Sequence, residues 1–381
     1  MQGVCSLRKY EVGKISILLW LFGVMAYPFF FGNPYPHRWA ASDYWSHMAQ
    51  VTNGWAIPLY YWGDWFLHLF YYPLSKIGLS VGDFYWIVAM LAFIGACYSI
   101  YKFGTLVGAS YKTLFFILLG GYGILEYVSA CIIPDFIAMY ILGMGYLYFL
   151  YKWVAGGKPS NLIWASVFLL MACLTHYKPG GELILGSGLF LGILLLAKTY
   201  RSKAIVSLVM VLLTTGVVMA LYLGVPHGGT SLVGKEIEYI ATGSGIALST
   251  PLGSKTFLSW QFNPFSMIAV LVSMVGIVYL RKHLKPSELL PLIMVACFVI
   301  ALSVGAFTTI TRHPDRFGLD LSIFLCIGLA MMYHIITKNS DKLRNWGKRY
   351  SVVIYGCLIL SASIIIPRYI GGVGSWLKIF A

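Results

Sequence analysis

The stretch "AIVSLVMVLLTTGVVMALYLG", residues 204–224, decides the fold class. It carries no charged residue and is long enough to cross the hydrocarbon core of a bilayer as a helix, which takes about 20 residues. Similar apolar runs recur from Ile15 to Ile366. They lack the alternation of a barrel strand, and a helix satisfies its own backbone hydrogen bonds in lipid. We therefore predict an all-α polytopic membrane protein.

The composition supports the same class. Hydrophobic residues make up 59% of the 381 residues and charged residues only 10%, whereas a soluble domain carries about a quarter charged residues. The formal net charge of +14 does not indicate nucleic-acid binding, because the basic residues lie between the apolar runs and form no arm or stripe. The seven cysteines are scattered without a CxxC pair, which favours packing roles.

The apolar runs predict about eleven transmembrane helices in one domain, residues 1–381, and we expect no soluble domain. The predicted spans are 15–32, 84–101, 113–130, 134–151, 161–175, 182–197, 204–224, 265–280, 289–307, 319–337 and 351–366. The first run follows Arg8, Lys9 and Lys14 but has no small-x-small cleavage site. It is therefore interpreted as a membrane helix and not as a signal peptide.

Charge distribution predicts the orientation. With the N-terminus inside, most of the 27 basic residues fall in the inside loops, as the positive-inside rule requires. All 13 acidic residues except Glu11, Glu288 and Asp341 then fall in outside loops or at the outer ends of helices, together with six of the eight histidines. Acidic residues contribute little to orientation, so this asymmetry indicates that any active site lies at the outer face.

Two outside segments are long. Residues 33–83 contain two candidate surface helices, "SDYWSHMAQVTNG" and "DWFLHLFYYPLSKIG", which mix aromatic and polar residues as interfacial helices do. Residues 225–264 are rich in glycine, serine and threonine and are expected to form a flexible loop. In the first segment, Asp43 and His47 share one face if the segment is helical, although Asp43 could also be only a helix N-cap.

The first outside loop, "RWAASDYWSHMAQVTNGWAIPLYY" (residues 38–61), resembles that of the GT-C superfamily of membrane glycosyltransferases. It has an acid-x3-His pattern followed by G-x-x-x-P-L-Y-Y. The resemblance continues in "GILEYVSACIIPDFIAMYILGMGYLYFLY", "THYKPGGELILGSGLFLGILL" and "TRHPDRFGLDLSIFLCIGLAMM". It implies transfer of a sugar from a polyprenyl-phosphate donor to a glycan, lipid or protein acceptor, with Asp43 as the catalytic base. The expected location is a prokaryotic inner or plasma membrane, with the active face periplasmic or extracellular.

Glycosyl transfer from a lipid phosphate needs a base at the acceptor hydroxyl, and we expect an inverting displacement. Asp43 and His47 are the first-loop candidates, with Asp135 or Glu126 as a supporting acid. Asp135 follows Pro134, so it could equally be a first-turn acid favoured by the helix dipole. Glu126 lies close to an apolar run, where an ionisable group is costly.

The departing phosphate needs cations. The outside cations and histidines nearest to helix ends are Lys178, His176, Arg312, His313 and Arg316. Arginine binds phosphate through its planar fork, and lysine acts as a point charge. Snorkelling to lipid head groups is an equally open alternative for each of them, and the two arginines could instead form an ion-pair network with nearby acids.

Metal dependence and two rival functions stay open at this point. Asp43 and Asp135 are the candidate ligands if Mg²⁺ or Mn²⁺ is bound, but no tight ligand spacing is present. A polymerase or ligase of lipid-linked glycans is one alternative, and a transporter or flippase of lipid-linked sugars is the other. The transporter would need ionisable residues at mid-membrane, and the predicted spans contain few of them.

Overall fold

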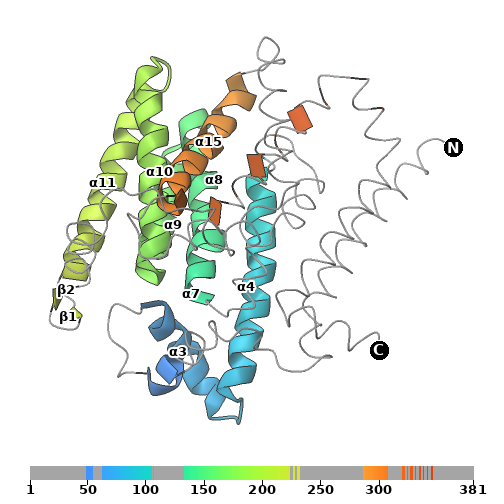
Figure 1. Ribbon diagram of the computed structural model, residues 1–381, viewed down its shortest axis with the longest axis vertical. Helices are drawn as coiled ribbons and strands as arrows, with labels where there is room; N and C mark the ends of the chain where they lie inside the picture. Colours follow the sequence, from blue (N-terminus) through green and yellow to red (C-terminus); the bar gives the residue numbers. More distant parts are fainter. Residues whose placement is uncertain are drawn as a thin grey trace.

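The computed structural model of the chain describes residues 49–54, 62–104, 106, 133–223, 226–227, 230–231 and 286–307, and a set of helical positions between Asp320 and Asn345. The elements are α3 (Trp62–Ser75), α4 (Val81–Gly104), α7 (Ile133–Phe136), the π-helix η3 (Ile137–Gly143), α8 (Met144–Gly156), α9 (Pro159–Thr175), α10 (Tyr177–Leu196), α11 (Arg201–Leu223), the strands β1 (Pro226–His227) and β2 (Thr230–Ser231), and α15 (Pro286–Phe307). Figure 1 shows this arrangement.

The described part of the chain is mostly helical, which confirms the helical part of the prediction. Three of its helices are long and apolar enough to cross a membrane, namely Pro134–Gly156, Tyr177–Leu196 and Arg201–Tyr222. Pro159–Thr175 and Leu289–Ser303 are shorter apolar helices. The total of eleven spans and the orientation remain predictions.

Most predicted spans in the described region fall on helices that extend a few residues beyond them. The spans at 15–32, 113–130, 265–280 and 351–366 lie outside the described residues, and the span at 319–337 is represented by helical positions that begin at Asp320. Two details differ from the prediction. Residues 137–143 form a π-helix inside the predicted 134–151 span, and the predicted loop at 225–264 begins with a two-residue antiparallel pair, Pro226 with Ser231 and His227 with Thr230.

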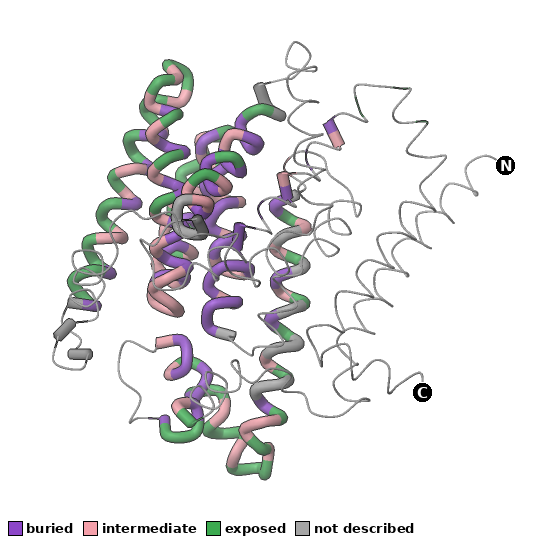
Figure 2. The backbone as a smooth tube through the Cα atoms, viewed as in Figure 1, coloured by how far each residue is buried: buried purple, intermediate pink, exposed green. Residues whose placement is uncertain are grey.

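The helices pack closely because small residues lie at their contacts. A Cβ at Gly186 of α10 would lie 2.5 Å from the ring of Phe298 in α15, and one at Gly145 would lie 2.7 Å from the ring of Phe168 in α9. Small residues let helix backbones approach one another in membranes, where no hydrophobic force drives helix association. Figure 2 shows buried residues along η3 and α8 and many exposed residues on α11.

Hydroxyl groups join the helices inside this bundle. Tyr146 of α8 donates to Ser187 Oγ of α10 at 2.7 Å, and the Tyr222 hydroxyl of α11 donates to the Cys173 carbonyl of α9 at 2.9 Å. Hydrogen bonds between membrane helices contribute about 0.6 kcal/mol on average, so they fix helix register more than they add stability.

The two ends of the bundle differ in charge. The turns that join α8 to α9 and α10 to α11 carry Lys158 and Lys198, and the first turn of α11 carries Arg201 and Lys203. Lys203 Nζ donates to the Val154 carbonyl at 2.9 Å, where a cation is favoured by the helix dipole. The opposite end gathers α3, the start of α7, the α9–α10 junction and the end of α11 (Figure 1), and this end carries the candidate site.

Candidate functional site

Asp135 enters the site at the first turn of α7. Pro134 precedes it, and proline is suited to a first turn because no intrahelical partner exists there for a backbone N–H. The Asp135 side chain is buried, with a relative exposure of 1%. The π-helix η3 begins two residues later, and π-helical turns are frequent at functional sites.

His176 enters the site from the junction of α9 and α10. Its backbone is extended (φ −155°, ψ 129°), so α9 ends there and α10 starts in a new direction. Pro179 sits in the first turn of α10, where its missing N–H costs no intrahelical hydrogen bond. The sequence "THYKPGG" thus places an imidazole at the N-terminus of α10.

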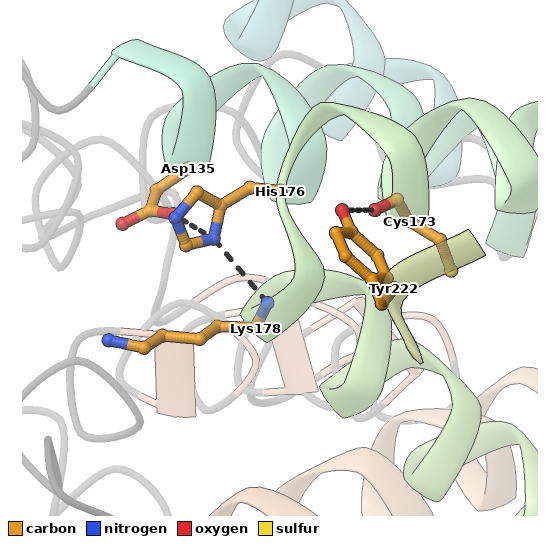
Figure 3. Close-up of polar contacts among 5 residues, drawn as sticks. All are labelled: Asp135, Cys173, His176, Lys178 and Tyr222. Carbon is orange, nitrogen blue, oxygen red and sulfur yellow. Dashed lines mark hydrogen bonds and ion pairs between the residues drawn. The ribbon is translucent and has the colours of Figure 1, made fainter. Parts of the chain in front are cut away.

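The two side chains meet across the junction, as Figure 3 shows. His176 Nδ1 lies 2.6 Å from Asp135 Oδ1, and the two side chains are 12% and 1% exposed. The same nitrogen also lies 3.4 Å from the Lys178 backbone N. A single ring nitrogen cannot donate and accept at once, and 3.4 Å exceeds the usual hydrogen-bond range of about 2.7–3.2 Å. The contact with Asp135 therefore dominates and places a proton on Nδ1, which leaves Nε2 as the basic nitrogen of the neutral ring.

Lys178 places a cation next to this pair. It lies in the first turn of α10, it is half-buried, and its ammonium group lies 5.9 Å from the centre of the Tyr177 ring. In Figure 3 its side chain extends past His176 toward the side on which Asp135 lies. This end of the bundle thus holds a carboxylate from α7 in contact with an imidazole from the α9–α10 junction, and an ammonium group on the residue two positions after that imidazole.

Helix α3 packs against this end. A Cβ at Gly63 would lie 2.7 Å from Pro134 Cβ and 2.7 Å from the Thr175 carbonyl oxygen. These two residues directly precede Asp135 and His176, so only glycine lets α3 approach both halves of the pair. The next residue, Asp64, is buried and brings another carboxyl group to this end.

Further polar residues lie one to two turns deeper in the bundle. Glu182 of α10 and Asp320 are both buried, and Tyr140 of η3 donates a hydrogen bond to Asp320 Oδ1. The sequence predicted Glu182 at the outer end of a helix starting at 182, but α10 starts at Tyr177, which moves this carboxyl group inside the bundle. Proline is common in the first turn of a helix, so Pro179 was the sequence signal for a helix that starts near residue 177.

The structure therefore brings together three of the predicted site residues, Asp135, His176 and Lys178. The other predicted site residues lie outside the described residues: Asp43, His47, Glu126, Arg312, His313 and Arg316. Sequence reasoning did not select Asp64, Tyr140, Glu182 or Asp320. Tyr140 and Asp320 are 180 positions apart, and no local sequence pattern predicts a contact over that separation.

The metal prediction stays a prediction. Within the described residues, no group of three or more histidine, cysteine, aspartate and glutamate side chains is arranged to hold a metal ion. One of the two predicted ligands, Asp43, lies outside this part of the chain.

The sequence matches no protein-family model and no curated protein.

Proposed function

We propose that the chain is a membrane glycosyltransferase that transfers a sugar from a polyprenyl-phosphate donor to a glycan, lipid or protein acceptor. The observation that carries the proposal is the contact between Asp135 and His176 beside Lys178. An oriented imidazole, a carboxylate and a cation are the groups that transfer from a lipid phosphate requires. The resemblance of the first outside loop to GT-C enzymes is the second support.

The chemistry assigns each group a task. The acceptor oxygen attacks the anomeric carbon, the bond from this carbon to the phosphate oxygen breaks, and its electron pair leaves with the phosphate. The acceptor proton goes to a base. His176 is one candidate, because Asp135 holds its Nδ1 proton and thereby keeps Nε2 basic. Asp43 remains the candidate from the sequence, and Lys178 offers its positive charge to the departing phosphate.

The surface of α3 suits a lipid-linked donor. Its inner side buries Asp64, Leu67 and His68, whereas Phe66 and Phe70 are exposed. A helix with this division lies in the membrane interface, with its apolar side among the acyl chains. Gly63 of α3 lies against Pro134 and Thr175, so a donor held along α3 would have its phosphate near the Asp135–His176 pair.

Membranes supplied with a radiolabelled polyprenyl-phosphate sugar and a mixed acceptor extract provide the test. Asp135→Asn and His176→Gln should each reduce transfer by about 10²–10⁴-fold, the usual contribution of general acid–base catalysis. Asp83→Asn is the matched control, because Asp83 is an exposed carboxylate in the first turn of α4. Unchanged transfer in both site variants would remove the Asp135–His176 pair from the mechanism and return the role of base to Asp43.

One observation favours a second candidate, a transporter of lipid-linked sugars. Glu182 and Asp320 are carboxyl groups buried among helices, and ionisable residues inside a membrane bundle often mark a transport or proton pathway. Proteoliposomes that contain the purified protein separate the two functions. Translocation of a labelled lipid-linked sugar without cleavage of its phosphate bond supports the transporter, and release of free polyprenyl phosphate supports the transferase.

A further inference from the structure

Four cations gather at the end of the bundle opposite the candidate site (Figure 1). They lie in the α8–α9 turn, in the α10–α11 turn and in the first turn of α11, and they are Lys158, Lys198, Arg201 and Lys203. The start of α11 lies against the α8–α9 turn, because a Cβ at Gly157 would lie 3.2 Å from Lys203 Nζ. These four residues are called the basic cluster below.

Two members of the basic cluster are held in place by backbone carbonyls. Lys203 Nζ donates to the Val154 carbonyl in the last turn of α8, and Arg201 Nε donates to the Leu195 carbonyl in the last turn of α10, both at 2.9 Å. An ammonium group has three N–H donors and a guanidinium group has five. Within the described residues, the other N–H groups of these two side chains have no acceptor. The fold thus positions both cations and leaves donors for a ligand.

The positive charge of the basic cluster is not balanced within the described part of the chain. Neither α9 nor α11 has an acidic residue in its first turn, although the N-terminus of a helix favours an anion. Among the described residues, no carboxylate forms a salt bridge with any of the four cations. Lys158, Lys198 and Arg201 are exposed, so an anion from outside the chain can reach them.

An exposed apolar surface begins next to the basic cluster. Leu196, which ends α10, is 83% exposed. Along α11 the exposed apolar side chains include Ile205, Val206, Val209, Leu212, Leu213 and Val217, and Figure 2 shows the exposed residues of this helix. Because α11 is long and apolar enough to cross a membrane, this surface suits acyl chains. A ligand that matches both features combines an anionic head group with acyl chains.

We propose that the basic cluster binds the head-group phosphate of an anionic phospholipid, whose acyl chains lie along the exposed apolar side of α11. Arg201 and Lys203 supply donors that the fold has already oriented, and Lys158 and Lys198 add positive charge at the rim. The site is separate from the Asp135–His176 pair and does not depend on the proposed glycosyl transfer. A free phosphate ion would use the cations but not the apolar surface.

Native mass spectrometry of the purified full-length protein tests the site. The protein is titrated with phosphatidylglycerol or with phosphatidylcholine of the same acyl chains, and the bound lipids are counted. We expect tighter binding of phosphatidylglycerol. A lysine or arginine beside anionic lipid contributes about fivefold in affinity. The double variant Lys198→Gln, Arg201→Gln should therefore weaken phosphatidylglycerol binding about 25-fold and affect phosphatidylcholine binding much less.

A matched control removes the same number of positive charges elsewhere. Lys76 follows α3 at the other end of the bundle, and the Lys152 ammonium group lies 4.5 Å from the centre of the Tyr148 ring. The double variant Lys76→Gln, Lys152→Gln should keep the wild-type affinity for phosphatidylglycerol. Equal losses in the two double variants would indicate diffuse attraction and overturn the proposal. Equal affinity of the wild-type protein for both lipids would overturn it as well.

Thermal unfolding of the wild-type protein keeps the test decisive if the Lys198–Arg201 variant folds poorly. A ligand raises the unfolding temperature according to its concentration relative to its Kd. Phosphatidylglycerol should therefore stabilise the protein more than phosphatidylcholine does, and more than inorganic phosphate at the same concentration. Equal stabilisation by inorganic phosphate would identify an anion site that does not recognise lipid, and this outcome contradicts the proposal.

Discussion

His68 Nδ1 lies 2.5 Å from the carbonyl oxygen of Val51, and both residues are buried. A carbonyl only accepts hydrogen bonds, so the His68 proton is on Nδ1. This bond joins α3 to the helical segment 49–54. That segment lies just after Asp43 and His47 in the sequence. Gly54 ends that segment with φ +55°, against the His68 ring.

Gly54→Ala should therefore destabilise the protein. The new Cβ would lie 2.2 Å from His68 Cε1 and Nε2, and such overpacking costs about 1–3 kcal/mol. The left-handed backbone conformation costs a non-glycine residue about 1–2 kcal/mol more. Gly78→Ala is the matched control, because Gly78 also has a positive φ, +90°, but a Cβ added there would meet no atom within 4 Å. Thermal unfolding in detergent should show the larger loss for Gly54→Ala, and equal losses would mean that the ring contact contributes nothing.

The glycines of α10 provide a second matched comparison. Gly186→Ala would place a Cβ 2.5 Å from the Phe298 ring, whereas a Cβ at Gly188 meets nothing within 4 Å. Replacing a helical glycine by alanine stabilises by up to about 1 kcal/mol when there is room. Gly188→Ala should thus be neutral or stabilising, and Gly186→Ala should lower the unfolding temperature because α10 and α15 separate. The contact is unimportant if both variants unfold at the same temperature.

These comparisons mark what the sequence could and could not predict. The positions of α4, α8, α9, α10, α11 and α15 follow from hydropathy, because a run of membrane length has few alternatives to a helix. The π-helical turn at Ile137–Gly143 leaves no hydropathy signal. The contacts of Asp135 with His176 and of Tyr140 with Asp320 join residues far apart in the chain. They arise from helix packing, which one sequence does not encode as a local pattern.

Substitutions of Lys178 test its predicted contact with the phosphate of the donor. Lys178→Met removes the charge but keeps much of the side-chain length, so it should raise the KM for the polyprenyl-phosphate donor about tenfold, which corresponds to about 1.4 kcal/mol of lost binding. Lys178→Arg should retain most of the affinity, since both side chains are cations. Lys76→Met is the control, because Lys76 is an exposed cation that follows α3. Equal KM values in the Lys178 and Lys76 variants would favour head-group snorkelling over donor binding.

The orientation can be read from two positions at opposite ends of the bundle. Ile77 is 80% exposed just after α3, and Ser160 is exposed at the start of α9, beside the basic turn. In a background without the native cysteines, Ile77→Cys should react with a membrane-impermeant maleimide in intact cells. Ser160→Cys should react only after permeabilisation, because the positive-inside rule places its basic neighbours in the cytoplasm. The reverse pattern would put the Asp135–His176 pair at the cytoplasmic face, where polyprenyl-phosphate donors presented from outside would not reach it.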